Sequence, residues 1–291
     1  METISNEKLC VAVSPHGAEL KSIKDDKGKE YLWQADPRYW SRHSPILFPI
    51  VGTLWNGTAH FGNKDCRMGR HGFARDMDFK LIAKTGNKLT FLLHDDAETF
   101  GKYPFHFNLA ISYRLDGNAI HVVWHVENTD DKAIHFQIGG HPAFNIPGIK
   151  PGEPMRGLLK LDAENPIRRF VAHDSGCLDG ARHEEVKTED GVWAFDEESF
   201  KDDALIFDHC QIRQASLLDT DGKPAVTLDF KSPAVGIWSP YGKNAPFICI
   251  EPWYGVTDVD GYEGDFANRY LTNQLLPGAS FMSEYTIRIN G

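Results

Sequence analysis

A run of alternating apolar and polar residues, from Phe107 to Leu115, constrains the fold of this chain more than any other feature. Successive side chains of a β-strand point to opposite faces, so the alternation predicts a strand with one buried and one exposed face. The turn residues Asp116-Gly117-Asn118 follow at once, and a second β-favouring run continues from Ala119 to Glu127. Glycine beside Asp and Asn is typical of a tight hairpin turn. The two runs therefore predict a long antiparallel hairpin.

The same signals recur along the chain, whereas no long amphipathic helix pattern is present. Further strands are predicted at Leu9–Val13, Leu20–Ile23, Glu30–Trp33, Phe79–Ala83, Leu89–Leu93, Ala204–Asp208, Ala215–Leu218, Ala225–Phe230 and Glu284–Ile289. Two prolines interrupt the apolar run from Ser44 to Gly52, which favours a buried extended segment over a central strand. Residues 147–201 are rich in charge, Pro and Gly, and are predicted to form long loops with at most a short helix near Glu197–Phe200.

Chain length and strand number together indicate the architecture. All-β sandwiches and barrels can exceed about 200 residues as one unit, so the 291 residues are predicted to form a single all-β domain, residues 1–291. The predicted strands are too numerous for a small sandwich. Two large, mostly antiparallel sheets packed face to face would accommodate them.

Charge and cysteine content exclude several classes of function. The net charge of −10 gives no basic surface for nucleic acid, and no apolar run approaches the ~20 residues of a membrane-spanning helix. The five cysteines are scattered without a CxxC pair, which favours reduced thiols in a cytoplasmic protein and argues against a disulfide framework or a zinc site. The segment from Met1 to Lys8 lacks the pattern of a signal peptide. Abundant aromatic residues, including seven tryptophans, suit a large β core or a carbohydrate-facing cleft.

The stretch from Phe247 to Gly255 is the first candidate for chemistry. An apolar, β-favouring run leads into Glu251, and Pro252 is predicted to close the strand because proline lacks a backbone donor. This places a carboxylate at the mouth of a buried strand, with Trp253 and Tyr254 beside it. Aromatic rings pack on the C–H face of a sugar ring, so the pattern suits a sugar site. The alternative is an ordinary surface glutamate at a strand end.

Two histidine turns supply candidate partners for that carboxylate. His71 is followed by Gly72, and His141 stands between paired glycines and Pro142. Either histidine alone could be a hydrogen-bonded structural residue. Together with Glu251 they suit acid–base chemistry, because unperturbed Glu and His side chains titrate near pH ~4.3 and ~6.5. Asp208 is a further candidate, since a carboxylate after a buried apolar run is costly unless it is paired or faces a ligand.

Metal binding is the alternative use of histidine in this chain. His121, His125 and Glu127 share one face of the predicted strand from Ala119 to Glu127. A solvated strand face is the favoured interpretation, because no third histidine lies nearby in the sequence. The chain also lacks the H-E-x-x-H motif of zinc hydrolases. No metal site is predicted.

With these segments in view, the sequence resembles the aldose 1-epimerase (galactose mutarotase) superfamily, and its LacX-like branch in particular. The resemblance rests on four segments in the family's order, which are His71-Gly72-Phe73-Ala74-Arg75-Asp76, Gly140-His141-Pro142-Ala143-Phe144-Asn145, Leu205-Ile206-Phe207-Asp208, and Glu251-Pro252-Trp253 with Gly255 and Asp258. It implies a β supersandwich that interconverts the α and β anomers of a hexose. It also implies that no metal or organic cofactor takes part.

The resemblance assigns roles residue by residue. Glu251 matches the general base that takes the proton of the C1 hydroxyl, and His141 matches the general acid that protonates the ring oxygen. His71 matches a second histidine that hydrogen-bonds the sugar, and Asp208 matches the carboxylate that grips ring hydroxyls. Additional candidates for substrate contact are Arg75, Phe144 and Trp253.

One position departs from the family pattern. Family members often carry an arginine after the first apolar run, where this chain has Thr53. A threonine cannot supply a bidentate cationic group. Either Arg70 or Arg75 takes this role, or the sugar is held differently.

The leading hypothesis is an aldose 1-epimerase that acts on a free hexose or a related aldose, a small-molecule substrate. A hexose 6-phosphate is a close variant, for which the cationic candidates are Arg42, Arg70, Arg75 and Lys102. A non-catalytic sugar-binding or sensing protein on the same fold is the alternative from another class. Glycoside hydrolysis by Asp208 and Glu251 ranks last, because it leaves the two histidines without a role. A homodimer is compatible with the sequence but is not indicated by any feature in it.

Overall fold

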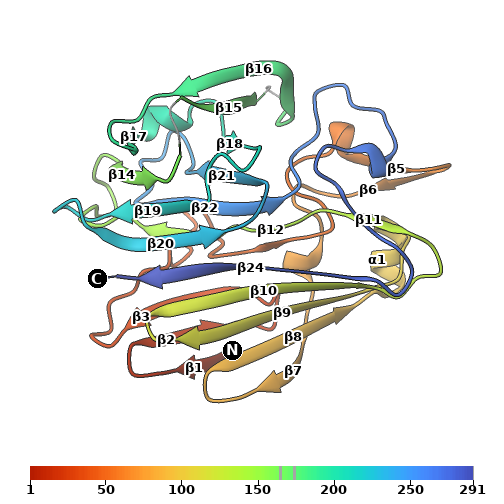
Figure 1. Ribbon diagram of the computed structural model, residues 1–291, viewed down its shortest axis with the longest axis horizontal. Coiled ribbons are helices and arrows are strands. Elements are labelled where there is room, and N and C mark those ends of the chain that lie inside the picture. Colours follow the sequence, from red (N-terminus) through yellow and green to blue (C-terminus); the bar gives the residue numbers. More distant parts are fainter. Residues whose placement is uncertain (164–165, 173–174, 291) are drawn as a thin grey trace.

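Two large antiparallel sheets make up most of the protein (Figure 1). We analysed a computed structural model, which describes residues 1–163, 166–172 and 175–290. The nine-stranded sheet has the strand order β17 (Val192–Asp196), β14 (Arg156–Leu161), β19 (Gln214–Leu218), β20 (Pro224–Phe230), β24 (Ser280–Ile289), β10 (Ala119–Asn128), β9 (Phe107–Asp116), β8 (Lys88–His94) and β7 (Lys80–Lys84).

The eight-stranded sheet packs against it and carries the residues of interest. Its order is β16 (Leu178–Val186), β15 (Ile167–Ala172), β18 (Leu205–Phe207), β21 (Ala234–Trp238), β22 (Phe247–Tyr254), β12 (Ile138–Gly140) and β4 (Ile46–Leu47), with β13 (Ala143–Asn145) also paired to β22. Smaller sheets comprise β1 (Glu2–Ser5), β2 (Leu9–Val13) and β3 (Leu20–Asp25); β5 (Thr58–Phe61) and β6 (Lys64–Arg67); and β11 (Ile134–Phe136) and β23 (Asn273–Leu275).

Helical structure is short throughout the described residues. One α-helix, α1 (Ala97–Lys102), is accompanied by single 3₁₀ turns at Trp55–Gly57, Ala74–Asp76, Glu197–Phe200 and Phe266–Asn268. No helix among the described residues is long and apolar enough to cross a bilayer. The all-β prediction is therefore confirmed.

The hairpin that the alternation predicts is formed by β9 and β10, which pair from Asp116↔Ala119 to Phe107↔Asn128. Leu109, Ile111 and Tyr113 on β9 have no solvent exposure, whereas the side chains between them are partly exposed. The buried face belongs to a core that both sheets share, since the same cluster contains Ile248 and Ile250 of β22. One continuous core supports the proposal of a single domain.

The prediction of loops over residues 147–201 is wrong. This stretch contains β14, β15, β16 and β17, although the 3₁₀ turn at Glu197–Phe200 lies where a short helix is predicted. Strands β16 and β17 are the outer strands of the two sheets, and β14 and β15 lie next to them. Strands at a sheet edge bury less surface, so charged residues are tolerated on them and the alternation that reveals a central strand is weak.

The prediction that Pro252 closes its strand is also wrong, because β22 continues to Tyr254. On one side Pro252 stands opposite Val235 of β21. On the other side β22 pairs with β13 up to Cys249 and with β12 from Trp253. The backbone N–H of Ile250 points toward that second side, where it donates to the Pro142 carbonyl at 3.3 Å. The nitrogen of residue 252 points the same way, into the gap between β12 and β13, so a missing donor there removes no ladder bond.

Strand β22 carries buried side chains on both faces of the eight-stranded sheet. Ile248 and Ile250 point into the shared core, whereas Cys249, Glu251 and Trp253 point to the opposite face of the eight-stranded sheet. Loops from distant parts of the chain cover that outer face.

Candidate active site

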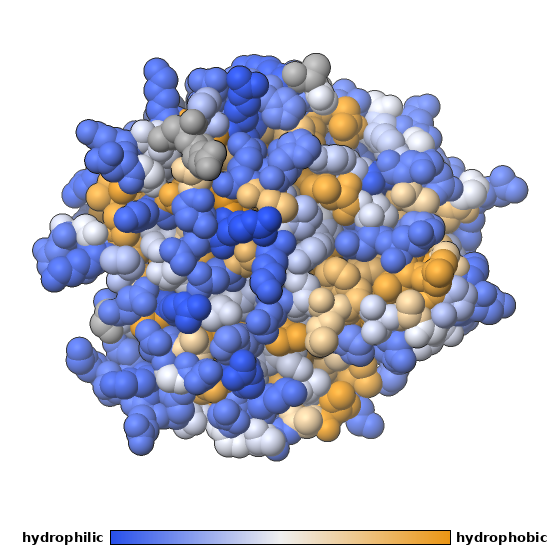
Figure 2. Space-filling model, in the orientation of Figure 1, coloured by the Kyte–Doolittle hydropathy of each residue, from blue (hydrophilic) through white to orange (hydrophobic). Residues whose placement is uncertain are grey.

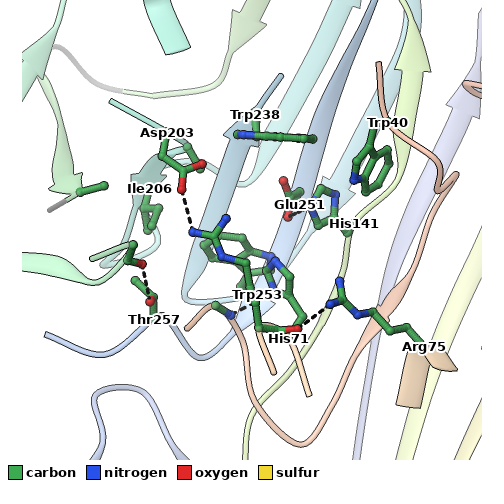
Figure 3. Close-up of a pocket in the computed structure, with 15 residues that line it drawn as sticks. Trp40, His71, Arg75, His141, Asp203, Ile206, Trp238, Glu251, Trp253 and Thr257 are labelled. Atoms are coloured by element: carbon green, nitrogen blue, oxygen red, sulfur yellow. Dashed lines mark hydrogen bonds and ion pairs between the residues drawn. The ribbon is translucent and has the colours of Figure 1, made fainter. Parts of the chain in front are cut away.

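A cavity of about 230 Å³ opens on the outer face of the eight-stranded sheet (Figure 3). Its floor is formed by β22, and its walls come from loops that are far apart in the sequence. The lining residues are Trp40, Gly52, Arg70, His71, Arg75, His141, Ala172, Gly176, Asp203, Ala204, Ile206, Trp238, Glu251, Trp253 and Thr257. Five of the seven residues proposed from the sequence as site residues are among them.

Glu251 and His141 meet in this cavity. Figure 3 shows the carboxylate and the imidazole side by side, and Glu251 Oε2 lies 3.3 Å from His141 Nε2. Both side chains are almost fully buried. Burial raises the pKa of Glu251 well above its usual value, and nearby Asp203 raises it further. Burial also lowers the pKa of His141 to about 3, with Arg75 adding to the effect. At neutral pH these directions leave a single proton on the pair, held by Glu251.

Several buried polar atoms belong to residues that line the cavity and have no hydrogen bond within the described protein. Among the described residues, no hydrogen-bond partner is present for Glu251 Oε2, His141 Nδ1 or Trp253 Nε1. Buried polar atoms normally have partners, and each one left unsatisfied costs about 1–3 kcal/mol. A hydroxyl-rich ligand would supply donors and acceptors to this set.

His71 is held in one tautomer by the backbone. Its Nδ1 accepts a hydrogen bond from the Gly52 N–H at 3.0 Å, so the proton of the neutral ring must be on Nε2. Burial lowers the pKa of His71 well below its usual value, and the adjacent His141 contributes to the lowering. The ring is therefore a neutral donor. It lies 5.4 Å from the His141 ring between centroids, at 83°.

The turn that presents His71 depends on the glycine that follows it. His71 and Gly72 both have positive φ, at 67° and 72°. A Cβ on residue 72 would lie 2.2 Å from the carbonyl oxygen of Phe48, which only glycine avoids. Gly72 thus lets the turn pack directly against the backbone at Phe48.

Arg70 lines the cavity and contributes a cationic guanidinium group. Its Nε donates to Thr53 Oγ1 at 2.9 Å, and its Nη2 contacts Asp203 Oδ2 at 2.7 Å. Arg75 lies behind it and donates from Nη2 to the Arg70 carbonyl at 2.7 Å. Arg70 and Arg75 are the two candidates to replace the arginine that family members often carry. Arg70 contacts Thr53, which stands at the sequence position of that arginine.

A column of aromatic rings ends on His141. Trp33 stacks on Phe247 at 4.6 Å between ring centroids, Phe247 lies 5.8 Å from Trp40, and Trp40 stacks on the imidazole at 4.8 Å and 26°. Trp238 meets the same imidazole edge-on at 5.7 Å. The two tryptophans restrict the His141 ring to one plane, beside Glu251.

Comparison with known proteins places this geometry in a family. The family model described as aldose 1-epimerase matches residues 2–259. The chain belongs to the aldose 1-epimerase family. It is 33% identical over 296 residues to the chromosomal LacX protein of Lactococcus lactis subsp. lactis, with 98% of each chain covered. The family membership and LacX-like character indicated by the four sequence segments are confirmed.

Two solved structures of this aldose 1-epimerase type are very similar to the protein. A galactose mutarotase related enzyme from Lactobacillus acidophilus has a TM-score of 0.93 and 36% identity, covering 100% of this chain and 97% of that one. A galactose mutarotase-like protein from Lactobacillus casei ATCC 334 has a TM-score of 0.94 and 32% identity, with both chains fully covered. The galactose mutarotase-like fold is therefore confirmed. Membership in the family indicates a small-molecule sugar as the substrate class.

Two residues proposed for the epimerase site lie outside the cavity. Phe144 has no exposure and belongs to the shared core, because it points to the opposite face of β13 from Ala143. Asp208 is also buried, but it accepts from the Tyr270 hydroxyl at 2.8 Å and lies 3.3 Å from His209 Nε2. Strand β18 ends at Phe207, and the hydrogen bond from Tyr270 holds the Asp208 carboxylate away from the cavity lining.

Besides Glu251, the carboxylate that lines the cavity is Asp203. It stands at positive φ (71°) in the turn before β18, five residues earlier than the proposed Asp208. Trp40, Trp238 and Thr257 are the other polar or aromatic residues of the cavity that the sequence did not single out. The high tryptophan content was the only sequence signal that pointed toward them.

Proposed function

We propose that this protein is an aldose 1-epimerase that interconverts the α and β anomers of a free hexose or a related aldose. The observation that carries the proposal is the buried pair of Glu251 and His141, in contact at 3.3 Å within a cavity that also receives the fixed N–H of His71. Anomerisation moves two protons and breaks one hemiacetal bond, so one positioned base and one positioned acid are sufficient.

The reaction uses the single proton that the pair holds. For ring opening, the proton first passes from Glu251 to His141 across their 3.3 Å contact. The Glu251 carboxylate then takes the proton of the C1 hydroxyl, and His141 donates its proton to the ring oxygen as the C1–O bond breaks. The pair then again carries one proton, now on Glu251. After rotation about C1–C2, Glu251 returns its proton to the carbonyl oxygen and His141 accepts the proton of the attacking hydroxyl. Acid–base steps of this kind contribute about 10²–10⁴-fold each.

The remaining residues bind and orient the sugar in this proposal. The Nε2–H of His71 donates to the ring oxygen, where negative charge develops on opening. Arg70 and Asp203 offer a paired donor and acceptor to vicinal hydroxyls. Trp253 lies on the cavity floor, where its ring can pack on the C–H face of the sugar.

Polarimetry tests the proposal directly. Crystalline α-D-glucose and α-D-galactose are dissolved, and optical rotation is followed with wild type and with Glu251→Gln. Wild type should accelerate equilibration, and the variant should lose at least about 10²-fold of that acceleration. Glu127→Gln, on the partly exposed face of β10, is the matched control and should behave as wild type. Sugar binding by wild type without any acceleration would instead identify a sugar-binding or sensing protein.

A hexose 6-phosphate is the second candidate substrate, and the arginines of the cavity favour it. The guanidinium groups of Arg75, Arg70 and Arg42 all act to lower the pKa of His71, so all three lie within electrostatic reach of the site. Arg70 pairs with Asp203, and Arg42 with Asp76 at 2.7 Å. Arg75 shares Asp76 with Arg42: its Nε lies 3.7 Å from Asp76 Oδ2, although this nitrogen makes no hydrogen bond among the described residues. Three guanidinium groups thus share two carboxylates, Asp203 and Asp76, and the remaining positive charge favours an anionic substrate.

Anomer signals in NMR separate the two substrates. Glucose 6-phosphate and glucose are compared in kcat/KM with wild type and with Arg75→Met. Preference for the phosphate, lost in the variant, would assign the phosphorylated sugar; equal losses for both sugars would assign the free one. Lys102, the fourth cation considered, binds Glu98 at 2.7 Å and does not line the cavity. Glycoside hydrolysis loses its sequence-based support, because Asp208 is not at the cavity.

A further inference from the structure

A buried thiol lies beside the acid–base pair. Cys249 stands two residues before Glu251 on β22, so both side chains point to the same face of the sheet. One donor atom each from His141, Cys249 and Glu251 lies within 4.8 Å of the other two. Among the described residues, this is the single group of three or more His, Cys, Asp or Glu side chains spaced for a metal ion. Neither His121 nor His125 belongs to it.

We propose that His141, Cys249 and Glu251 form an inhibitory binding site for a thiophilic divalent cation of the Zn²⁺ class. The inhibition rests on the proposed epimerase function, whereas the binding site itself does not. A thiolate, an imidazole and a carboxylate are the ligand types that zinc takes in proteins. Mg²⁺ and Ca²⁺ prefer oxygen ligands throughout, so the sulfur selects against them.

The surroundings fit a cation with three protein ligands. Glu251 Oε2 is fully buried and has no hydrogen-bond partner among the described residues, so it retains a lone pair for a metal. The stacked Trp40 ring fixes the His141 plane. Zinc bonds of about 2.0–2.3 Å put tetrahedral ligand atoms roughly 3.3–3.7 Å apart, so the widest pair needs to close by about 1 Å. A side-chain rotation of Cys249 or Glu251 achieves that.

Charge balance also favours the ion. Binding requires the Cys249 thiolate and the Glu251 carboxylate, whose two negative charges a divalent cation neutralises. The thiol proton and the proton held by Glu251 both leave to solvent when the metal binds. The fourth ligand position faces the cavity, because Glu251 and His141 both line it whereas Cys249 lies behind them. A water or a sugar hydroxyl would complete the tetrahedron there.

The consequence for the epimerase is loss of both proton-transfer groups. A metal that occupies the carboxylate and the imidazole takes the lone pairs that accept protons in each half of the reaction. Micromolar Zn²⁺ in a chelator-free buffer should therefore slow the catalysed equilibration of α-D-glucose, and EDTA should restore it. Mg²⁺ at the same concentration should have no effect.

Two cysteine variants test whether Zn²⁺ inhibits at this site or elsewhere in the protein. Cys249→Ala removes the sulfur ligand, and its half-inhibiting Zn²⁺ concentration, relative to its own metal-free rate, should rise by more than about tenfold. Cys66→Ala is the matched control: Cys66 is also buried, but it lies on β6 and outside the group, so its sensitivity should equal that of wild type. Equal inhibition of wild type and Cys249→Ala would overturn the proposal.

A spectroscopic titration reports the site independently of turnover. Co²⁺ added to wild type should produce one equivalent of a thiolate-to-cobalt charge-transfer band in the near ultraviolet, together with the visible bands of tetrahedral cobalt. Cys249→Ala should lack the charge-transfer band, and Cys66→Ala should retain it. If wild type gave no charge-transfer band, the proposed metal site would be rejected even if the protein is an active epimerase. Its presence in a protein without epimerase activity would keep the metal site and reject the proposed function.

Discussion

Backbone and threonine contacts fix the side chains of two adjacent residues at the site. The Gly52 N–H determines which nitrogen of His71 carries the proton, and Thr53 Oγ1 anchors the guanidinium of Arg70. Neither partner is an acid or a base. In the proposed epimerase, these contacts remove alternative side-chain orientations before the sugar binds, which lowers the cost of binding.

The pH dependence of turnover follows from the directions of the two pKa shifts. The active pair must hold one proton. The pKa of His141 is about 3, so a second proton is added only in acid. The pKa of Glu251 is raised by burial, so the last proton is lost as the pH rises through that raised value. We expect a bell-shaped profile of kcat/KM, measured by polarimetry and corrected for uncatalysed mutarotation. A rate that rises steadily with pH would show that the active pair carries no proton.

Replacing Thr53 by valine tests the anchoring of Arg70. The variant keeps the side-chain shape but removes the acceptor of the Arg70 Nε–H. One such hydrogen bond is worth about 0.5–1.5 kcal/mol, so KM for the sugar should rise by about 2- to 10-fold while kcat changes little. Arg70→Met should raise KM further. Thr58→Val, on β5 and outside the cavity, serves as the control. An unchanged KM in Thr53→Val would exclude the positioning role.

At the scale of elements, a buried ion pair joins the loops on either side of the cavity floor. Arg269 Nε donates to Asp258 Oδ1, and both side chains are nearly inaccessible. Asp258 Oδ2 also accepts from the Trp55 N–H at 2.9 Å, and Arg269 Nη1 donates to Gln137 Oε1 at 2.8 Å. The network links the chain before β5, the residue between β11 and β12, and the chain after β22.

Asp258→Asn should therefore destabilise the protein strongly. The variant leaves Arg269 buried without its counter-charge, and breaking such a pair costs about 3–5 kcal/mol. Urea unfolding followed by fluorescence measures the loss. In contrast, Glu98→Gln removes an exposed i,i+4 pair with Lys102, which is worth about 0.3–0.5 kcal/mol. Similar losses in the two variants would show that the buried pair contributes no more than a surface pair.

Local signals determined which elements could be predicted. The β9–β10 hairpin is visible in the sequence because its alternation and its turn lie within about 20 residues. Strands β14–β17 lie at or next to sheet edges and carry charge, so the alternation of apolar and polar residues within a local window is too weak to predict them. The continuation of β22 through Pro252 could not be predicted from a local window either. It depends on a gap between β12 and β13, more than 100 residues earlier.

At the scale of the whole molecule, the fold explains which cavity residues could be recognised in the sequence and which could not. Glu251, His71 and His141 stand in short motifs with glycine or proline neighbours, so each could be singled out locally. Asp203, Trp40 and Trp238 reach the cavity only because the two sheets bring their loops to one face. Phe144 stands in the same motif as His141, but the alternation of β13 directs it into the core. Short motifs therefore indicate the proposed acid–base groups, whereas the residues of the cavity walls can be identified only from the fold.

Shortening the chain tests how far the fold depends on its last strand. A chain that ends at Gly278 lacks β24, which pairs with β10 on one side and β20 on the other. We expect it to lose cooperative thermal unfolding and to aggregate, because two unpaired inner edges are exposed. Deleting residues 2–5 instead removes β1, an edge strand, and should only lower the melting temperature. A folded chain without β24 would show that the two halves of the sheet are stable apart.

The surface is less informative about assembly. Figure 2 shows a face that is mostly hydrophilic, with hydrophobic residues gathered near β11. Large exposed apolar side chains include Leu276 and Met282. A homodimer and a cytoplasmic location stay predictions from the sequence.

The interior place of β24 has a consequence for how the protein is made. Strand β10 ends at Asn128 and β24 begins at Ser280, so about 150 residues must be translated before β10 can gain its neighbour. Ribosomes add about 5–20 residues per second, which leaves the inner edge of β10 open for roughly 8–30 s on every nascent chain. The cavity lies on the partner sheet, whose packing depends on the same core. The two sheets can therefore pack completely only after β24 has been translated, and slower translation prolongs the period in which the nascent chain is open to aggregation.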